Sequence, residues 1–142
     1  MVWKSALLIL ILACSVSALE ITEIMYNPSG SDTDREWIEI YSDEDVNIDG
    51  WKFYESGTNH GLSVVNGTYL FSGYAVIVDD YGDFIADYPD YNSTLFDSSF
   101  SLSNSGEEIA IKDDSLNIVD SVDYNASLAG EGYSIALVNG TW

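Results

Sequence analysis

Hydrophobic and polar residues alternate over short stretches of this chain, and turn-forming residues separate the stretches. After residue 19 no segment shows a sustained helical period of apolar positions. The alternating or apolar runs predict strands over residues 19–26, 36–41, 50–54, 68–71, 74–78, 108–112, 117–124 and 133–138. About eight short strands at this spacing predict an all-β fold, arranged as a β-sandwich.

The segments between these strands carry their own signals. Residues 83–88 predict one short helix, because Phe84, Ile85 and Tyr88 fall on one side and Pro89 ends it. The segments 43–50 and 72–73 predict turns, and residues 57–61 predict a polar loop.

The second strand shows the alternation most clearly. Ile38 and Ile40 share one face, opposite Trp37, Glu39 and Tyr41. We assign these positions to the fold and not to a site.

The first 18 residues have the composition of a secretory signal. Lys4 precedes an almost purely apolar run over residues 6–16, and small residues follow up to Ala18. We therefore predict cleavage after Ala18, a domain over residues 19–142, and an extracellular or cell-surface location. The apolar run is shorter than the roughly 20 residues of a membrane-spanning helix. In an alternative interpretation, residues 11–14 form a lipoprotein box and Cys14 carries a lipid anchor.

The charge of the chain is strongly negative. It has 24 Asp and Glu residues against four Lys and Arg, giving a formal net charge of −20. Such a surface repels nucleic-acid backbones and anionic lipid headgroups, so neither is an expected partner. A solvated acidic surface of the halophilic type is one explanation, and binding of divalent cations is another. An aromatic content of 13% argues against disorder.

Several segments together resemble the lamin tail domain family, in its secreted prokaryotic type. They are residues 24–28 (IMYNP), 36–41 (EWIEIY), 49–51 (DGW), 102–111 (LSNSGEEIAI) and 132–135 (GYSI), and the resemblance extends over residues 19–138. It implies an immunoglobulin-like sandwich that acts as a non-enzymatic interaction or adhesion module, with a protein or cell-envelope component as partner. The alternative is a Ca²⁺- or carbohydrate-binding accessory module of a secreted hydrolase system.

Residues that would carry catalysis are scarce. The single histidine, His60, lies in the predicted polar loop, and no Gly-x-Ser-x-Gly nucleophile motif is present. Acidic residues are so frequent that no particular pair indicates an acid–base mechanism. The sequence predicts a protein that is not an enzyme and has no cofactor.

Two groups of side chains are candidates for ligand binding. Asp79, Asp80 and Asp83 are the first choice for a Ca²⁺ site, although their spacing matches no known calcium loop. Asp32 with Asp34, and the run 43–45, are weaker candidates. Tyr81, Tyr88 and Tyr91 gather around the predicted helix, where they are candidates for stacking on sugar rings or for packing into the core.

The Asn-x-Ser/Thr sequence occurs four times, at Asn66, Asn92, Asn125 and Asn139. All four positions fall in predicted loops or at strand ends, where a glycan would project into solvent. They are candidate N-glycosylation sites in a host that modifies such sequences. The alternative is that serine-rich loops produce these tripeptides by accident.

Overall fold

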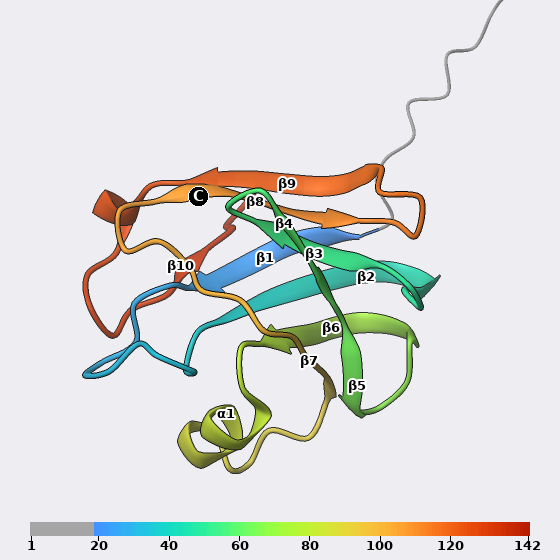
Figure 1. Ribbon diagram of the computed structural model, residues 1–142, viewed down its shortest axis with the longest axis horizontal. Coiled ribbons are helices and arrows are strands. Elements are labelled where there is room, and N and C mark those ends of the chain that lie inside the picture. Colours follow the sequence, from blue (N-terminus) through green and yellow to red (C-terminus); the bar gives the residue numbers. More distant parts are fainter. Residues whose placement is uncertain (1–18) are drawn as a thin grey trace, which may run out of the picture.

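The computed structural model describes residues 19–142, which form ten strands and one α-helix in two layers (Figure 1). The predicted signal segment 1–18, its cleavage after Ala18 and the alternative anchor at Cys14 lie outside the described residues. The elements are β1 (Glu20–Met25), β2 (Trp37–Asn47), β3 (Lys52–Glu55), β4 (Thr58–Gly61), β5 (Ser63–Asn66), β6 (Leu70–Val78), α1 (Tyr81–Asp87), β7 (Thr94–Asp97), β8 (Glu107–Lys112), β9 (Ile118–Tyr124), a 3₁₀ turn (Ala126–Leu128) and β10 (Ile135–Ala136).

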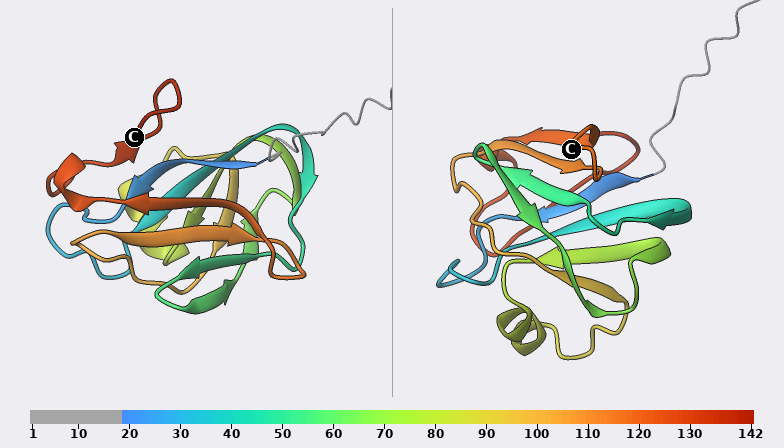
Figure 2. Two further views of the ribbon diagram at one scale, coloured as in Figure 1. Left: turned by 90° about the horizontal axis from the view of Figure 1, so that it is seen from above. Right: turned by 45° about the vertical axis from the view of Figure 1, so that its right-hand side comes forward.

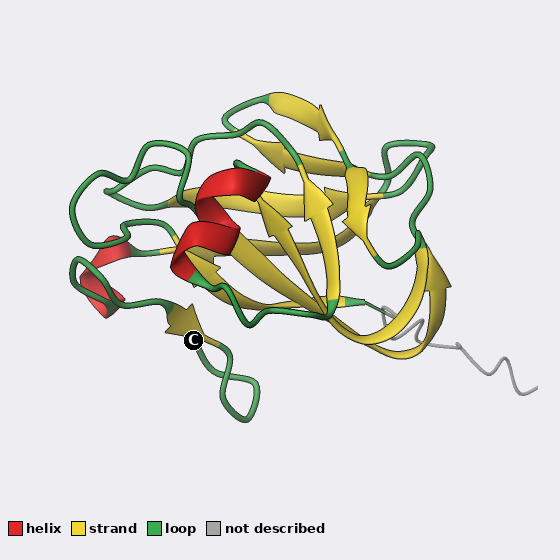
Figure 3. Ribbon diagram, turned by 90° about the horizontal axis from the view of Figure 1, so that it is seen from below, coloured by secondary structure: helices red, strands yellow, loops and turns green. Residues whose placement is uncertain are grey.

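Two sheets face each other and form an immunoglobulin-like sandwich, which confirms the predicted fold class (Figure 2). One sheet has six strands in the order β10-β1-β2-β6-β7-β5, and the other has four in the order β4-β3-β8-β9. Neighbouring strands are antiparallel except for the parallel pair β6–β7, which α1 connects. Figure 3 shows α1 in front of the six-stranded sheet, on the face away from the four-stranded sheet.

The core lies between the sheets and follows from the alternation along each strand. Ile38, Ile40 and Ile77 of the six-stranded sheet share one buried cluster with Phe53 and Ile109 of the four-stranded sheet. Full burial of a side chain of this size stabilises the fold by about 1.5–3 kcal/mol. A second, smaller cluster lies on the opposite face of the six-stranded sheet, beneath α1.

The two predicted turns at residues 43–50 and 72–73 are wrong in part, because β2 and β6 continue through them. The pairing of these two strands shifts register between Ser42 and Val46, and Ser42 lies opposite Gly73. Gly73 has a φ of +79°, a conformation that glycine adopts without a Cβ clash. A bulge in one strand and a glycine in the other therefore bend the pair where the sequence suggests that each strand ends.

The sequence pattern missed the short strands β4, β5 and β7. Four-residue strands with mixed burial carry too little periodicity to be recognised, and β7 pairs with β6 only after the α1 crossover. The last predicted strand, residues 133–138, shortens to Ile135–Ala136. Within residues 19–142 no helix is long and apolar enough to span a bilayer.

Candidate functional site

The outer face of the six-stranded sheet carries the aromatic and acidic side chains that alternate with the core residues. Trp37, Glu39 and Tyr41 of β2 lie on this face because Ile38 and Ile40 occupy the core face. The neighbouring strand β6 places Val76 next to Glu39 and Tyr74 next to Tyr41. Two pockets on this face share Glu39, and we call them together the outer-face site.

The first of these, the aromatic pocket, lies where α1 covers the sheet and has a volume of about 120 Å³. Asp80 begins the helix, since its side chain accepts a hydrogen bond from the backbone N–H of Asp83. Phe84 is the buried residue of α1 and packs on the sheet beside Trp37. The lining residues of the aromatic pocket are Trp37, Glu39, Val76, Phe84, Tyr88 and Tyr91.

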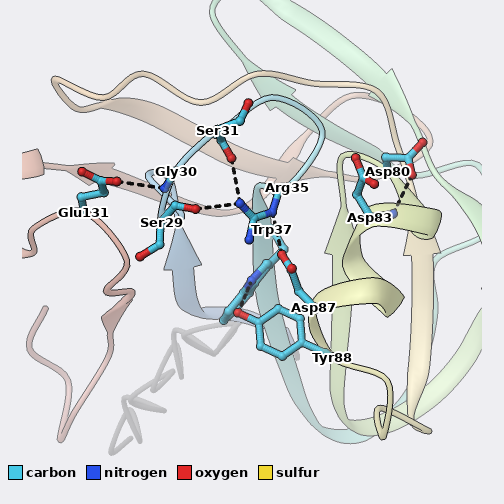
Figure 4. Close-up of polar contacts among 10 residues, drawn as sticks. All are labelled: Ser29, Gly30, Ser31, Arg35, Trp37, Asp80, Asp83, Asp87, Tyr88 and Glu131. Atoms are coloured by element: carbon cyan, nitrogen blue, oxygen red, sulfur yellow. Dashed lines mark hydrogen bonds and ion pairs between the residues drawn. The ribbon is translucent and has the colours of Figure 1, made fainter.

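Three of the ring contacts in the aromatic pocket are edge to face. The Trp37 ring lies 6.0 Å from that of Tyr88 at an interplanar angle of 89° and 6.4 Å from that of Phe84 at 81°, between centroids. Phe84 meets Tyr91 at 5.3 Å and 82°. The Trp37 Nε1–H donates to the Tyr88 hydroxyl at 3.3 Å (Figure 4), and the Tyr91 hydroxyl donates to the Thr94 carbonyl at 3.0 Å. These contacts fix the positions of the rings relative to one another.

Glu39 is a half-buried carboxylate at the edge of the aromatic pocket. It accepts a hydrogen bond of 2.7 Å from the Thr22 hydroxyl. Burial raises the pKa of Glu39, the Thr22 hydrogen bond opposes that rise, and the charge of Glu23 adds to it. Glu23 lies directly opposite Glu39 in the β1–β2 pairing and accepts a hydrogen bond from the Ser134 hydroxyl. The ion pairs within residues 19–142 are Arg35–Asp87 and His60–Glu55, and neither involves these two glutamates.

The second pocket, the wide pocket, is larger and has a volume of about 470 Å³. Tyr41 and Tyr74 form one wall, with ring centroids 4.7 Å apart, and Tyr74 is 55% exposed. Glu20 and Thr22 of β1, with the segment 137–140, line the remainder. Because Glu39 borders both pockets, a ligand that is too large for one pocket can extend across both, along the direction of β2.

Arg35 fixes α1 to the loop that precedes β2 (Figure 4). Its Nε donates to the Asp87 carboxylate at 2.8 Å, and its Nη1 donates to the carbonyls of Ser29 and Ser31 at 2.7 and 3.1 Å. The Asp87 carboxylate raises the pKa of Arg35, which stays charged. This arrangement joins the C-terminal end of α1 to the chain just before Trp37.

A second group of carboxylates, on the other side of β2, holds the loop 98–106 that crosses from β7 to β8. The backbone N–H of Phe100 donates to Asp79 at 3.0 Å, and that of Leu102 donates to Glu36 at 2.7 Å. Glu36 is only 4% exposed, and burial is the main cause that raises its pKa from 4.5 to about 8. Burial also raises the pKa of Asp79. With Asp32 and Asp34 they border a polar pocket of about 210 Å³.

Two of the three aspartates predicted to bind Ca²⁺ accept hydrogen bonds from backbone groups in different parts of the fold. Asp79 turns toward the loop 98–106, whereas Asp80 caps α1 through the N–H of Asp83. Within residues 19–142 the structure forms no group of three or more His, Cys, Asp or Glu side chains placed to hold a metal ion. The Ca²⁺ site remains a prediction from sequence.

The predicted loop position of His60 is wrong, because His60 lies on β4. Its Nε2 is 3.0 Å from a carboxylate oxygen of Glu55 on the paired strand β3, and Glu55 is buried. Since β3 and β4 form a hairpin with a two-residue connection, this contact is local and structural.

The four sequon asparagines, Asn66, Asn92, Asn125 and Asn139, are all exposed. Asn66 donates to the Ser93 carbonyl at 2.7 Å, and Asn125 caps the 3₁₀ turn by accepting from the N–H of Ser127 at 2.9 Å. Nothing in the structure tests whether they carry glycans, so glycosylation remains a prediction.

The structure brings two of the three predicted sugar-stacking tyrosines together. Tyr88 and Tyr91 line the aromatic pocket, whereas Tyr81 does not and is 43% exposed. Sequence reasoning missed Trp37, Glu39 and Tyr41 as site residues, although it placed them on one face. The signal that was available is that two large aromatic residues on one strand face away from the core.

The comparison with protein families gives a match to the Lamin Tail Domain over residues 13–126. The chain belongs to the lamin tail domain family, as its sequence motifs indicated. This family consists of immunoglobulin-like domains that typically take part in protein interactions and have no catalytic activity. No curated protein and no solved structure matches the chain.

Proposed function

We propose that this protein is a secreted or cell-surface, non-enzymatic interaction module that binds a protein or cell-envelope component through its outer-face site. The observation that carries the proposal is the exposed face of the six-stranded sheet, where aromatic rings and carboxylates line two adjoining pockets. Aromatic residues in a preformed concave surface are typical of binding sites. Membership of the lamin tail domain family supports a role in interaction.

The location of the natively expressed protein tests the first half of the proposal. We expect a mature chain that begins at Leu19 and is recovered in the medium or on the cell surface. Intact mass with and without deglycosylation also reports on the four sequons, and a lipid adduct on Cys14 would indicate tethering to the membrane. An uncleaved, unmodified chain in the cytoplasm would overturn the proposed location.

Binding to cell-envelope fractions tests the second half. We expect the purified protein to bind such fractions saturably, and Tyr41→Ala combined with Tyr74→Ala to remove binding, because both rings form the wall of the wide pocket. Tyr54→Ala is the matched control, since Tyr54 lies on the four-stranded sheet under Lys112. Equal losses in the two variants would contradict a role for the outer-face site.

A carbohydrate-binding accessory module of a secreted hydrolase system is the second candidate function. The Tyr41–Tyr74 pair, in which Tyr74 is exposed, favours it, because exposed tyrosine rings stack on sugar faces. A rise in Tm with oligosaccharides but not with envelope protein would support this candidate. A rise with Ca²⁺ alone would instead favour the cation-binding interpretation of the acidic surface.

A further inference from the structure

The Glu23–Glu39 pair is an unfavourable arrangement within the sheet itself. The two residues are direct partners in the β1–β2 register, so both side chains lie on the outer face. Like charges directly opposite one another on a sheet repel, and in this chain no ion pair within residues 19–142 offsets them. The hydroxyls of Thr22 and Ser134 donate one hydrogen bond to each carboxylate, but they bring no positive charge.

The neighbouring aromatic pocket has the surroundings that a positively charged group prefers. The rings of Trp37, Phe84, Tyr88 and Tyr91 line a space of about 120 Å³, and Glu39 lies at its boundary. The negative face of an aromatic ring attracts a cation within about 6 Å, most strongly for tryptophan. The formal net charge of −20 adds a negative electrostatic potential, which also attracts a cation.

The hydrogen-bonding groups of the pocket narrow the class of cation. A lysine ammonium carries three N–H donors and a guanidinium five, all of which need acceptors when desolvated. Among the lining residues, the acceptors are the Glu39 carboxylate and the hydroxyl oxygens of Tyr88 and Tyr91, each group already in one hydrogen bond, and the other lining side chains offer no acceptor. Most of the wall around a desolvated ammonium or guanidinium would therefore give its N–H groups no partner. A metal ion such as Ca²⁺ needs six to eight oxygen ligands, which aromatic walls do not supply. A quaternary ammonium group has no N–H donors that need acceptors, and it needs no oxygen ligands.

We propose that the aromatic pocket of Trp37, Phe84, Tyr88 and Tyr91, with Glu39 at its edge, binds a quaternary ammonium group. The wide pocket shares Glu39, so the group belongs to a larger partner whose remainder lies over Tyr41 and Tyr74. A trimethylated lysine side chain in a peptide is the source to which we commit. A phosphocholine headgroup is disfavoured, because its phosphate meets an acidic surface. This inference rests on the proposed function and names the chemical group that half of the outer-face site takes.

Titration with choline, followed by tryptophan fluorescence at constant ionic strength, tests the pocket alone. The uncharged isostere 3,3-dimethylbutanol is the matched ligand, and we expect saturable binding of choline in the millimolar range with little binding of the alcohol. Glu39→Gln should weaken choline binding about tenfold, because it removes the charge at the pocket edge while keeping its shape. Glu108→Gln on the four-stranded sheet is the control and should bind like the unchanged protein.

Three results would overturn the assignment. They are equal binding of choline and its uncharged isostere, unchanged binding by Glu39→Gln, and displacement of choline by millimolar Ca²⁺ at constant ionic strength. Circular dichroism shows whether each variant is folded, and Tyr88→Phe, which keeps the ring, provides a second variant that should still bind choline.

The source of the group is tested with two further probes. A trimethyl-lysine peptide should bind more tightly than choline, and its unmethylated counterpart more weakly than the methylated peptide. Neutral phosphocholine vesicles should not bind, and vesicle binding without peptide binding would overturn the peptide source. Failure of the choline titration leaves envelope binding by Tyr41 and Tyr74 to be measured separately, so the two proposals fail independently.

Discussion

Two groups of buried or half-buried carboxyl groups lie on either side of β2, and they accept hydrogen bonds from different kinds of donor. Glu36 and Asp79 accept hydrogen bonds from backbone N–H groups of the loop 98–106. Glu39 and Glu23 accept hydrogen bonds from side-chain hydroxyls, those of Thr22 and Ser134 respectively. Glu39 also borders the pocket lined by aromatic rings. Burial raises the pKa of Glu36, Asp79 and Glu39 alike.

The difference shows that a raised pKa does not by itself mark a binding site. The carboxylates of Glu36 and Asp79 satisfy buried N–H groups of the chain, so their interactions belong to the fold. Glu23 and Glu39 satisfy no backbone donor in β1 or β2, and their repulsion weakens the sheet that carries them. Local conflicts of this kind are expected where a protein binds something.

Among substitutions in these two groups, Glu36→Ala is expected to have the largest effect on stability. The substitution leaves the buried N–H of Leu102 without its acceptor and opens space beneath the loop 98–106. The free energy of unfolding at pH 5 should fall by about 1–3 kcal/mol, measured by urea denaturation. A loss as small as that of an exposed glutamate, for which Glu108→Ala serves as control, would show that the loop does not depend on Glu36.

The second expected effect is a decrease in stability as the pH rises. The folded protein keeps the proton of Glu36 up to a pKa of about 8, whereas the unfolded chain loses it near 4.5. The folded state therefore binds more protons between these values. The stability that protonated Glu36 contributes is fully present below pH 4.5 and is lost as the pH rises through 8. We expect at least about 1 kcal/mol less stability at pH 8.5 than at pH 5.

Glu36→Gln sharpens this result, because glutamine keeps an oxygen acceptor for Leu102 without a titrating charge. The pH dependence should become markedly flatter in this variant, whereas Glu108→Gln should leave it unchanged. If Glu36→Gln kept the full slope, the decrease would have to come from the other carboxylates.

A smaller effect of opposite sign is expected on the other side of β2. Glu39→Gln removes one charge from the Glu23–Glu39 pair, so it should stabilise the protein by about 0.2–1 kcal/mol at pH 8 and low salt. Glu23→Gln should do the same, and the double variant should gain little more than either single one. The gain should shrink in high salt, and a destabilised Glu39→Gln would show that Glu39 is required by the fold.

The smallest effect concerns Arg35, which contacts Asp87 at the surface. Arg35→Met should lower the Tm slightly, and most of that change should vanish in high salt. Amide hydrogen exchange should accelerate in the loop 27–36 and at the end of α1, which Arg35 joins. Unchanged exchange at both ends would mean that packing of Phe84 alone positions α1.

The sequence was informative about each strand and uninformative about what lies against it. The alternation along residues 36–41 correctly predicted that Trp37, Glu39 and Tyr41 share a face. It could not predict that α1 covers Trp37, because the helix is brought there by the parallel β6–β7 crossover. Nor could it place Glu23 opposite Glu39, since a register shift between Ile21 and Glu23 sets that pairing.

The acidic residues show the same limit over longer distances. Three neighbouring aspartates, Asp79, Asp80 and Asp83, suggested a site because they are close in sequence. The structure instead sends Asp79 to a loop 21 residues away and joins Glu36 to Leu102 across 66 residues. In a chain with 24 acidic residues, the partner of each carboxylate depends on loop paths that local patterns do not encode.

The position of β1 between β2 and β10 has a consequence for the order in which the chain can fold. Beyond its pairing with β2, β1 is completed by late residues: Asp120 accepts from the N–H of Ile21, and the N–H of Leu137 donates to the Thr22 carbonyl. Contacts between segments so distant in sequence make folding slow. During synthesis, β1 therefore leaves the ribosome long before its other partners, with one edge open to other extended chains. A chaperone that covers this edge would act on the folding intermediate, at a surface that the finished sandwich no longer exposes.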